Sequence, residues 1–122
     1  MWNLPDESTL KALPALYSTE HIPLQDKLIR LHFFIGSCDW WICEGDGDDL
    51  LWGFVILNND YQNAEWGYIS YSSLKDINIR GLEIENDLYW KVRPAREVDK
   101  IRKATMRWSN EYIQPAAEIS AL

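Results

Sequence analysis

Several features that mark common protein classes are missing from this sequence. The 122 residues include two cysteines and two histidines, and no window approaches the run of about 18 apolar residues that a membrane-spanning helix needs. The N-terminus MWNLPDESTL starts with acids, whereas a secretory signal starts with basic residues followed by an apolar stretch. We therefore expect a cytoplasmic protein that does not contact a membrane, in which Cys38 and Cys43 are reduced thiols.

Sequence motifs of catalysis and metal binding are missing too. The chain has no G-x-S-x-G turn, no phosphate-binding loop, no H-E-x-x-H and no G-x-G-x-x-G. A zinc site made of both histidines and both cysteines would match no standard spacing, and His32 alternates within an apolar segment as a packed or rim histidine does. The sequence predicts no enzyme, no cofactor and no metal, although any two of the 19 acids could still meet in a cleft as general acid and base.

Apolar and aromatic residues, by contrast, are plentiful. Hydrophobic residues make up 47% of the chain and aromatic residues 13%, with seven tryptophans, which is too apolar for an intrinsically disordered protein. A domain of this length buries roughly two thirds of the surface that its unfolded chain exposes. We expect one folded domain over residues 1–122.

Aromatic and branched residues, separated by turn formers, predict an antiparallel sheet in the middle of the chain. A helical turn is expected at 72–77, and a helix from about Ala95 to Ile113, which follows Pro94 and stops before Pro115. The predicted fold class is α+β, a small meander of about four or five strands with the C-terminal amphipathic helix packed on it. The expected strands are 28–35, 40–43, 50–57, 65–71 and, shorter, 87–92.

The expected strand LLWGFVIL is apolar on both faces, although a strand with one solvated face would alternate with polar residues. Trp40 and Trp41 are adjacent in a strand, so they also point to opposite sides. We expect the chain's own helix and N-terminal segment to cover both faces, with a protein partner or a homodimer as the alternative. The candidate aromatic contacts with such a partner are Trp41, Trp52 and Trp66.

The motif EGDGDD, residues 44–49, lies in a strongly acidic segment. Residues 39–87 carry eleven acids and two bases, a local charge of −9. Length and glycine content favour a hairpin turn, with a charged surface for a protein partner as the second interpretation. A calcium loop needs ligands at alternating positions and a glutamate at the twelfth, so a metal loop is disfavoured. The candidate partner-binding acids are Glu44, Asp46, Asp48 and Asp49.

The C-terminal part has the opposite charge. Residues 91–107 carry seven bases and two acids, a local charge of +5. A solvated helix face is the favoured interpretation of these bases, and contact with nucleic-acid phosphates or an acidic protein is the alternative, although the net charge of −7 repels nucleic acid at long range. At helical spacing, the apolar stripe is Val98, Ile101, Thr105, Trp108 and Tyr112, and the opposite basic stripe is Arg96, Lys100, Lys103 and Arg107.

Four segments together resemble a known family. LPALYSTEHIPLQDKLIRLHFFI, DWWICEGDGDDLLWGFVI, EWGYISYSSLKDI and GLEIENDLYW resemble short bacterial proteins that are classed as a domain of unknown function. The resemblance covers residues 13–90 and leaves 91–122 as a C-terminal helical extension. It implies a protein carried by plasmids, phages or other mobile elements, near conjugation, antirestriction or DNA-processing genes. It implies no catalytic residue.

Two functional hypotheses remain. The first is a small acidic accessory protein of a mobile genetic element that binds a protein, with an inhibitor of a nucleic-acid-handling defence complex as its concrete form. The acidic hairpin and the aromatic residues would then form the contact surface. The alternative is an accessory module that binds nucleic acid through the basic stripe.

Overall fold

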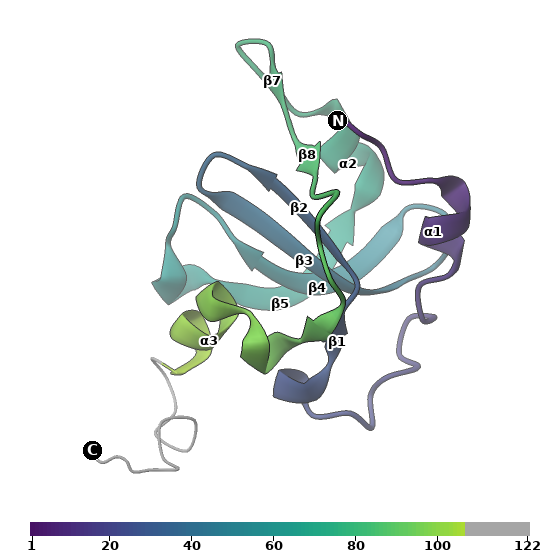
Figure 1. The fold of residues 1–122 in the computed structure, drawn as a ribbon, viewed down its shortest axis with the longest axis vertical. Helices are drawn as coiled ribbons and strands as arrows, with labels where there is room; N and C mark the ends of the chain where they lie inside the picture. The colour runs from purple at the N-terminus through teal and green to yellow at the C-terminus, as the bar shows by residue number, and fades with distance from the viewer. Residues whose placement is uncertain (107–122) are drawn as a thin grey trace.

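A five-stranded antiparallel sheet forms the centre of the computed structural model, which describes residues 1–106 (Figure 1). The strand order is β5-β4-β3-β2-β8, so four consecutive strands form a meander and the last strand returns beside the first of them. The predicted α+β class is confirmed. The strands are β2 Leu31–Ile35, β3 Cys38–Gly45, β4 Leu50–Ile56, β5 Glu65–Ser70 and β8 Glu85–Asn86.

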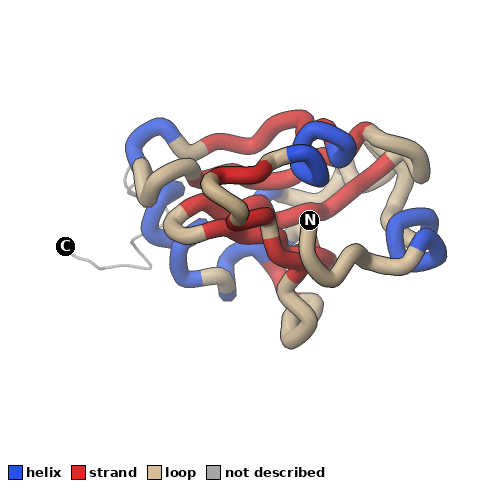
Figure 2. Tube along the Cα trace, turned by 90° about the horizontal axis from the view of Figure 1, so that it is seen from above, coloured by secondary structure: helices blue, strands red, loops and turns tan. Residues whose placement is uncertain are grey.

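Short helices and two small strand pairs surround this sheet (Figure 2). Within residues 1–106, no helix is both long and apolar enough to cross a membrane. The strand pairs are β1 Leu28–Ile29 with β9 Arg93–Pro94, and β6 Asn78–Ile79 with β7 Leu82–Glu83. The helices are α1 Glu7–Lys11, α2 Tyr71–Asp76 and α3 Asp99–Met106, and the 3-10 turns are η1 Leu24–Asp26, η2 Tyr61–Asn63 and η3 Ala95–Glu97.

Both faces of the central sheet are covered by the chain itself. Trp41 and Phe54 belong to one buried cluster, which includes Ile101 of α3. Trp40 points the other way and belongs to a second cluster, which includes Leu74 of α2. Accordingly, α2 and α3 lie far apart in Figure 1, with the strands between them. The sheet therefore needs no partner to bury these two sets of side chains.

Two predicted strands differ from the structure. The segment 28–35 is divided at Arg30. The fully buried Ile29 packs in the cluster that contains Trp41, and β1 pairs with β9 instead of continuing into β2. The strand predicted at 87–92 is wrong. Asp87 Oδ1 accepts a hydrogen bond from the Tyr89 N–H and the Asp87 carbonyl accepts one from Trp90, which closes a turn. Such a local side-chain bond competes with strand pairing.

The predicted helix at 95–113 begins later than expected. The 3-10 turn η3 comes first, Val98 is then extended with φ −94° and ψ 112°, and α3 follows. The Ala95 N–H donates to the carbonyl of Lys27, the residue that precedes β1. This bond fixes the direction of the chain before the helix starts. Residues 107–113 of this prediction, with Arg107, Trp108 and Tyr112, lie outside the described residues.

Strands β3 and β4 approach each other closely at one glycine. A β-bulge in β3 shifts the register, so that Glu44 lies opposite Trp52. Just before the bulge, a Cβ atom added to Gly53 would overlap the carbonyl oxygen of Trp41 in the neighbouring strand. Only glycine fits at this position without moving the two backbones apart.

Gly53→Ala is expected to destabilise the fold by roughly 2 kcal/mol or more, because the new methyl group overlaps the Trp41 backbone. Gly67→Ala in β5 is the matched control. Its φ is not positive and an added Cβ meets nothing within 4 Å, so its stability should change by less than about 0.5 kcal/mol. Urea unfolding followed by tryptophan fluorescence measures both, and equal stabilities would contradict the close approach at Gly53.

Candidate functional site

The acidic hairpin is a turn, as its sequence predicts. Asp46 Oδ1 accepts hydrogen bonds from the backbone N–H groups of Asp48, Asp49 and Leu50 at 2.8, 3.0 and 3.1 Å. Gly47 has a φ of 80°, a conformation that favours glycine. Asp46 Oδ1 therefore stabilises the turn, while the side chain stays exposed.

A second hairpin acid, Asp49, holds the start of α2. Its two carboxylate oxygens accept hydrogen bonds from the Ser72 N–H at 2.6 Å and the Ser70 hydroxyl at 2.9 Å. These bonds, that of Ser72 first, lower the pKa of Asp49. Asp48 is exposed, and its side chain makes no hydrogen bond or ion pair within residues 1–106. Asp48 is thus the hairpin acid that is most available to a partner.

Glu44 lies in β3 and not in the exposed turn, which corrects its predicted position. The bulge turns its side chain toward the face that carries Trp52, and it is only 4% exposed. Its Oε1 accepts the Tyr17 N–H at 2.9 Å, and its Oε2 accepts both the N–H, at 3.2 Å, and the hydroxyl of Thr19. Lys27 Nζ donates to the same hydroxyl at 2.9 Å, so Thr19 links a buried ammonium to the buried carboxylate.

A recess of about 240 Å³, which we call the aromatic recess, opens beside Glu44. Tyr17 at its mouth is 61% exposed and has a φ of 69°, which is unusual for a bulky residue and is held by the bond to Glu44. The Tyr68 hydroxyl donates to the Tyr17 hydroxyl at 2.7 Å, and this bond raises the pKa of Tyr68. The recess is lined by Tyr17, Glu20, Glu44, Trp52 and Tyr68.

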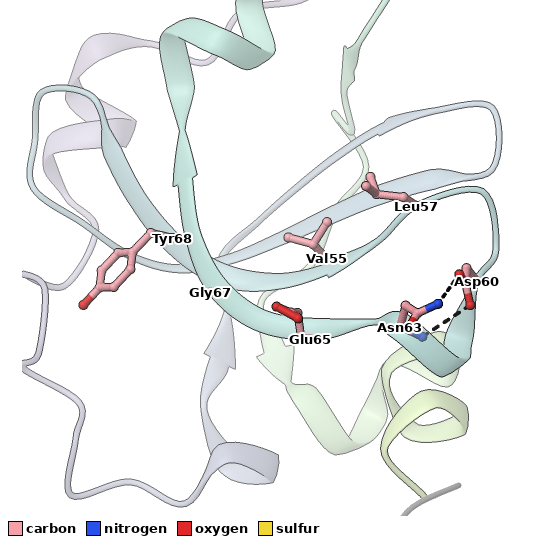
Figure 3. Close-up of a pocket in the computed structure, with 7 residues that line it drawn as sticks. All are labelled: Val55, Leu57, Asp60, Asn63, Glu65, Gly67 and Tyr68. Carbon is pink, nitrogen blue, oxygen red and sulfur yellow. Dashed lines mark hydrogen bonds between the residues drawn. The ribbon is translucent and has the colours of Figure 1, made fainter.

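A second recess of about 400 Å³, the apolar recess, lies beside the other end of β5 (Figure 3). Gly67 contributes no side chain to it, and an added Cβ would meet no atom within 4 Å. At one end, Asp60 accepts hydrogen bonds from the backbone and the side-chain amide of Asn63, at 3.3 and 2.7 Å. The lining is Val55, Leu57, Asp60, Asn63, Glu65, Gly67 and Tyr68.

Strand β5 separates the two recesses and ends the sheet. The register pairs Tyr68 with Trp52 and Gly67 with Gly53, so the alternation of the strand directs Tyr68 and the Gly67 position to opposite faces. In Figure 3, Tyr68 points away from the other side chains that are drawn. Within residues 1–106, β5 pairs only with β4, so its outer backbone groups have no strand partner. The arrangement offers an extended chain an open edge with a recess on each side.

The three candidate tryptophans occupy different environments. Trp41 is 2% exposed and stacks on His32 with ring centroids 5.3 Å apart, so its predicted role as a surface contact is wrong. Trp52 and Trp66 are half-buried and stacked, with ring centroids 5.1 Å apart. Lys27 Nζ lies 5.5 Å from the centroid of the Trp52 ring. Trp52 therefore reaches the aromatic recess, whereas Trp41 belongs to the core.

The predicted basic stripe does not form one free surface. Arg96 lies in η3 and makes an ion pair with Asp26, outside the helix that carries the other bases. Lys100 Nζ turns toward the sheet and donates to Asp39 Oδ2 at 2.8 Å. Lys103 is exposed, and Arg107 lies outside the described residues. Helical spacing predicted that these bases share one face. They do not, because Arg96 pairs with η1 and Lys100 pairs with the sheet.

A buried cluster of charges joins α3 to the sheet. His32 Nε2 lies 2.8 Å from Asp39 Oδ1, and His32 Nδ1 lies 2.9 Å from Asp87 Oδ2. Both ring nitrogens can donate to carboxylates at once only in the protonated imidazole. Burial raises the pKa of Asp39, but the bonds from His32 and Lys100 outweigh it, so this pKa lies below its ordinary value. These contacts join β2, β3 and α3.

Neither a cluster of metal ligands nor a disulfide occurs among residues 1–106. No group of three or more His, Cys, Asp or Glu side chains is placed to hold a metal ion among residues 1–106. Cys38 and Cys43 are free thiols. Burial raises the pKa of Cys43 to about 12, so its thiolate is scarce at neutral pH.

Comparisons of the chain with protein-family models, with curated proteins and with solved structures find no match. The resemblance to a mobile-element family therefore stays a prediction.

Three residues of the aromatic recess do not stand out in the sequence. Glu44 and Trp52 are among the predicted contacts, but Tyr17, Glu20 and Tyr68 are not. The one local signal is the glycine in EWGYIS, because a glycine inside a strand often marks a place where another chain or a ligand approaches. Tyr17 and Glu20 lie in a loop whose position depends on the buried Glu44.

Asp39→Asn is expected to destabilise the protein at neutral pH by roughly 2 kcal/mol, because it removes the carboxylate that bonds the largely buried His32 and the partly exposed Lys100. The folded pKa of Asp39 is lowered from 3.8, so its stabilisation is complete above that pH and declines as the pH falls below it. Urea unfolding of both proteins over a pH series measures this difference. A difference that stays constant into acid would contradict the ionised pair.

Proposed function

We propose that this protein binds another protein by accepting an extended segment of that partner along the outer edge of β5. The observation that carries the proposal is the open edge of β5 with one recess on each face. An added strand binds through main-chain hydrogen bonds, and pockets for its alternate side chains give specificity. Two recesses on opposite faces of one edge strand suit the alternation of such a segment.

The aromatic recess suits a lysine or arginine side chain. Tyr17, Trp52 and Tyr68 supply aromatic rings, and the exposed Glu20 supplies a carboxylate, while the bonded and buried Glu44 adds negative charge beneath them. Cations bind favourably to aromatic faces, and an arginine can in addition bond a carboxylate through two N–H groups. No lysine or arginine lines either recess, so a basic side chain of the partner would meet no repulsion from the lining.

The apolar recess suits an aliphatic side chain next to a basic one. Val55 and Leu57 line it with apolar surface, and Leu57 is half exposed. Glu65 and Asp60 add two carboxylates to the lining. We therefore infer a partner segment in which lysine or arginine alternates with aliphatic residues.

A second copy of the chain fits this edge less well. The net charge is −7, and two copies paired along β5 would bring the carboxylates of both recesses together. Like charges across a strand pair are destabilising. The edge thus favours a basic partner over the predicted alternative of a homodimer.

The more specific prediction, an accessory protein of a mobile genetic element that inhibits a defence complex, depends on the sequence resemblance. The β5 edge supports this prediction in one respect. Proteins that handle nucleic acids carry basic segments, and β5 would accept a basic segment. The alternative, nucleic-acid binding through the basic stripe, is weakened because Arg96 and Lys100 are engaged in ion pairs with Asp26 and Asp39.

A peptide of alternating lysine and valine is the probe that tests this proposal. We expect it to shift the backbone amide signals of residues 65–70 in an NMR titration and to slow the exchange of the outer amides. Gly67→Val should weaken binding by about tenfold or more, since its side chain fills the apolar recess without a clash. Unfolding by urea should show that this variant is as stable as the parent.

A charge-matched pair of variants separates a specific site from general attraction. Glu65→Lys lies in the apolar recess, and Glu7→Lys lies in α1, where it lines neither recess, but both change the net charge equally. Only Glu65→Lys should weaken binding of the basic peptide markedly. Equal losses in the two variants, or tight binding of a peptide of alternating glutamate and valine, would overturn the proposal.

A further inference from the structure

Three aromatic side chains line the aromatic recess, and two of them stand at its mouth. Tyr17 and Tyr68 are both more than half exposed. Their ring centroids lie 6.4 Å apart and their planes meet at 64°, so the rings form a corner instead of a face-to-face stack. Trp52 lies opposite Tyr68 in the strand pair, on the same face of the sheet, and is the third aromatic residue of the lining.

The polar groups of this recess are largely engaged within the chain. The two tyrosine hydroxyls bond to each other at 2.7 Å. Both carboxylate oxygens of Glu44 accept bonds from Tyr17 and Thr19. Glu20 is exposed, and its side chain makes no hydrogen bond or ion pair within residues 1–106. The recess therefore has negative charge around it but offers a ligand few free hydrogen-bond acceptors.

Lys27 shows what a primary ammonium needs beside these rings. Its Nζ lies 5.5 Å from the centroid of the Trp52 ring, and it does not line the recess. A primary ammonium has three N–H donors, and Lys27 directs its own to the carbonyl and the hydroxyl of Thr19. A lysine of a partner would meet no comparable pair of oxygen atoms in the recess, and unbonded donors there are costly.

We propose that the aromatic recess binds a trimethylated lysine of the partner segment. This inference rests on the proposed function, because the methylated lysine would be the basic residue that a segment bound along β5 places in this recess. Methylation keeps the positive charge of lysine, and the trimethylated form has no N–H donor left to satisfy. Aromatic rings attract such a quaternary ammonium, while its methyl groups pack against them.

The size and charge of the recess agree with this ligand. Its volume of about 240 Å³ is below the range of about 300–1,000 Å³ that is usual for whole small molecules, so it suits the end of one side chain. Glu20 and Glu44 attract a cation through space, which requires no hydrogen bond. A neutral apolar group of the same shape would gain nothing from these two acids.

Choline, ethanolamine and 3,3-dimethylbutanol test the recess without a peptide. Ethanolamine carries a primary ammonium in place of the quaternary one, and 3,3-dimethylbutanol has the shape of choline without its charge. In an NMR titration of the whole chain, we expect choline to cause saturable shifts of the Tyr68 amide and the Trp52 indole N–H signals. The other two compounds should bind about tenfold more weakly or worse. The proposal is overturned if choline causes no saturable shift or if either analogue binds equally well.

Two variants assign the binding of choline to the aromatic corner. Tyr68→Leu removes one ring from a half-exposed strand position and should weaken choline binding about tenfold. Tyr89→Leu is the matched control, because Tyr89 is 91% exposed and does not line the recess, so its affinity should equal that of the parent. Urea unfolding should show that both variants fold. Unchanged choline binding by Tyr68→Leu would contradict the proposal.

The peptide of alternating lysine and valine, with and without trimethylation of its lysines, connects this site to β5. We expect the trimethylated peptide to bind about tenfold more tightly. Equal affinities of the two peptides would overturn this inference alone. If neither peptide shifts the signals of residues 65–70 while choline still binds, the β5 proposal is overturned and the cation site remains.

Discussion

The rest of the structure depends on the burial of β3 on both faces. Trp40 and Trp41 are neighbours in this strand and point to opposite sides, and each is more than nine-tenths buried. Burying large apolar side chains is the main favourable contribution to folding, of about 1.5–3 kcal/mol each. A chain with few helices must therefore place one thin layer on each face, α2 with its neighbours on one and η3 with α3 on the other. The central strands are then covered on both faces, and among residues 1–106 the outer edge of β5 is left without a strand partner.

Buried charges decide where these covering segments attach. Glu44 and Lys27 meet through Thr19 and hold the loop that carries Tyr17. His32, Asp39 and Lys100 hold α3 in the same way. A buried charge is costly unless it is paired and hydrogen-bonded, so each cluster specifies one arrangement of its segment more strongly than apolar packing alone would. The walls of the aromatic recess are thus set by the buried Glu44 and Lys27, which Thr19 links through hydrogen bonds.

The two edges of the sheet have different chemistry. At β5 the backbone is open and the neighbouring carboxylates attract a cation. At the other edge, the Trp2 backbone bonds to Ile84 and Asn86 at β8, so the outer backbone there is covered. The first edge therefore suits an added basic strand, whereas the second does not.

The α+β class, the four-stranded meander and the hairpin at residues 46–49 could be predicted from the amino-acid sequence alone, because alternation, branched residues and turn formers act over a few neighbouring positions. Glu44 and Trp52 are also among the partner contacts that the sequence predicts, but their buried and half-buried positions are not predicted. Long-range packing, by contrast, buries Trp41 in the core, turns Glu44 inward at the bulge and brings Lys100 to Asp39. Tyr17 is held by a partner far along the chain, Glu44, and the distance between such residues is fixed by packing, which local periodicity does not encode.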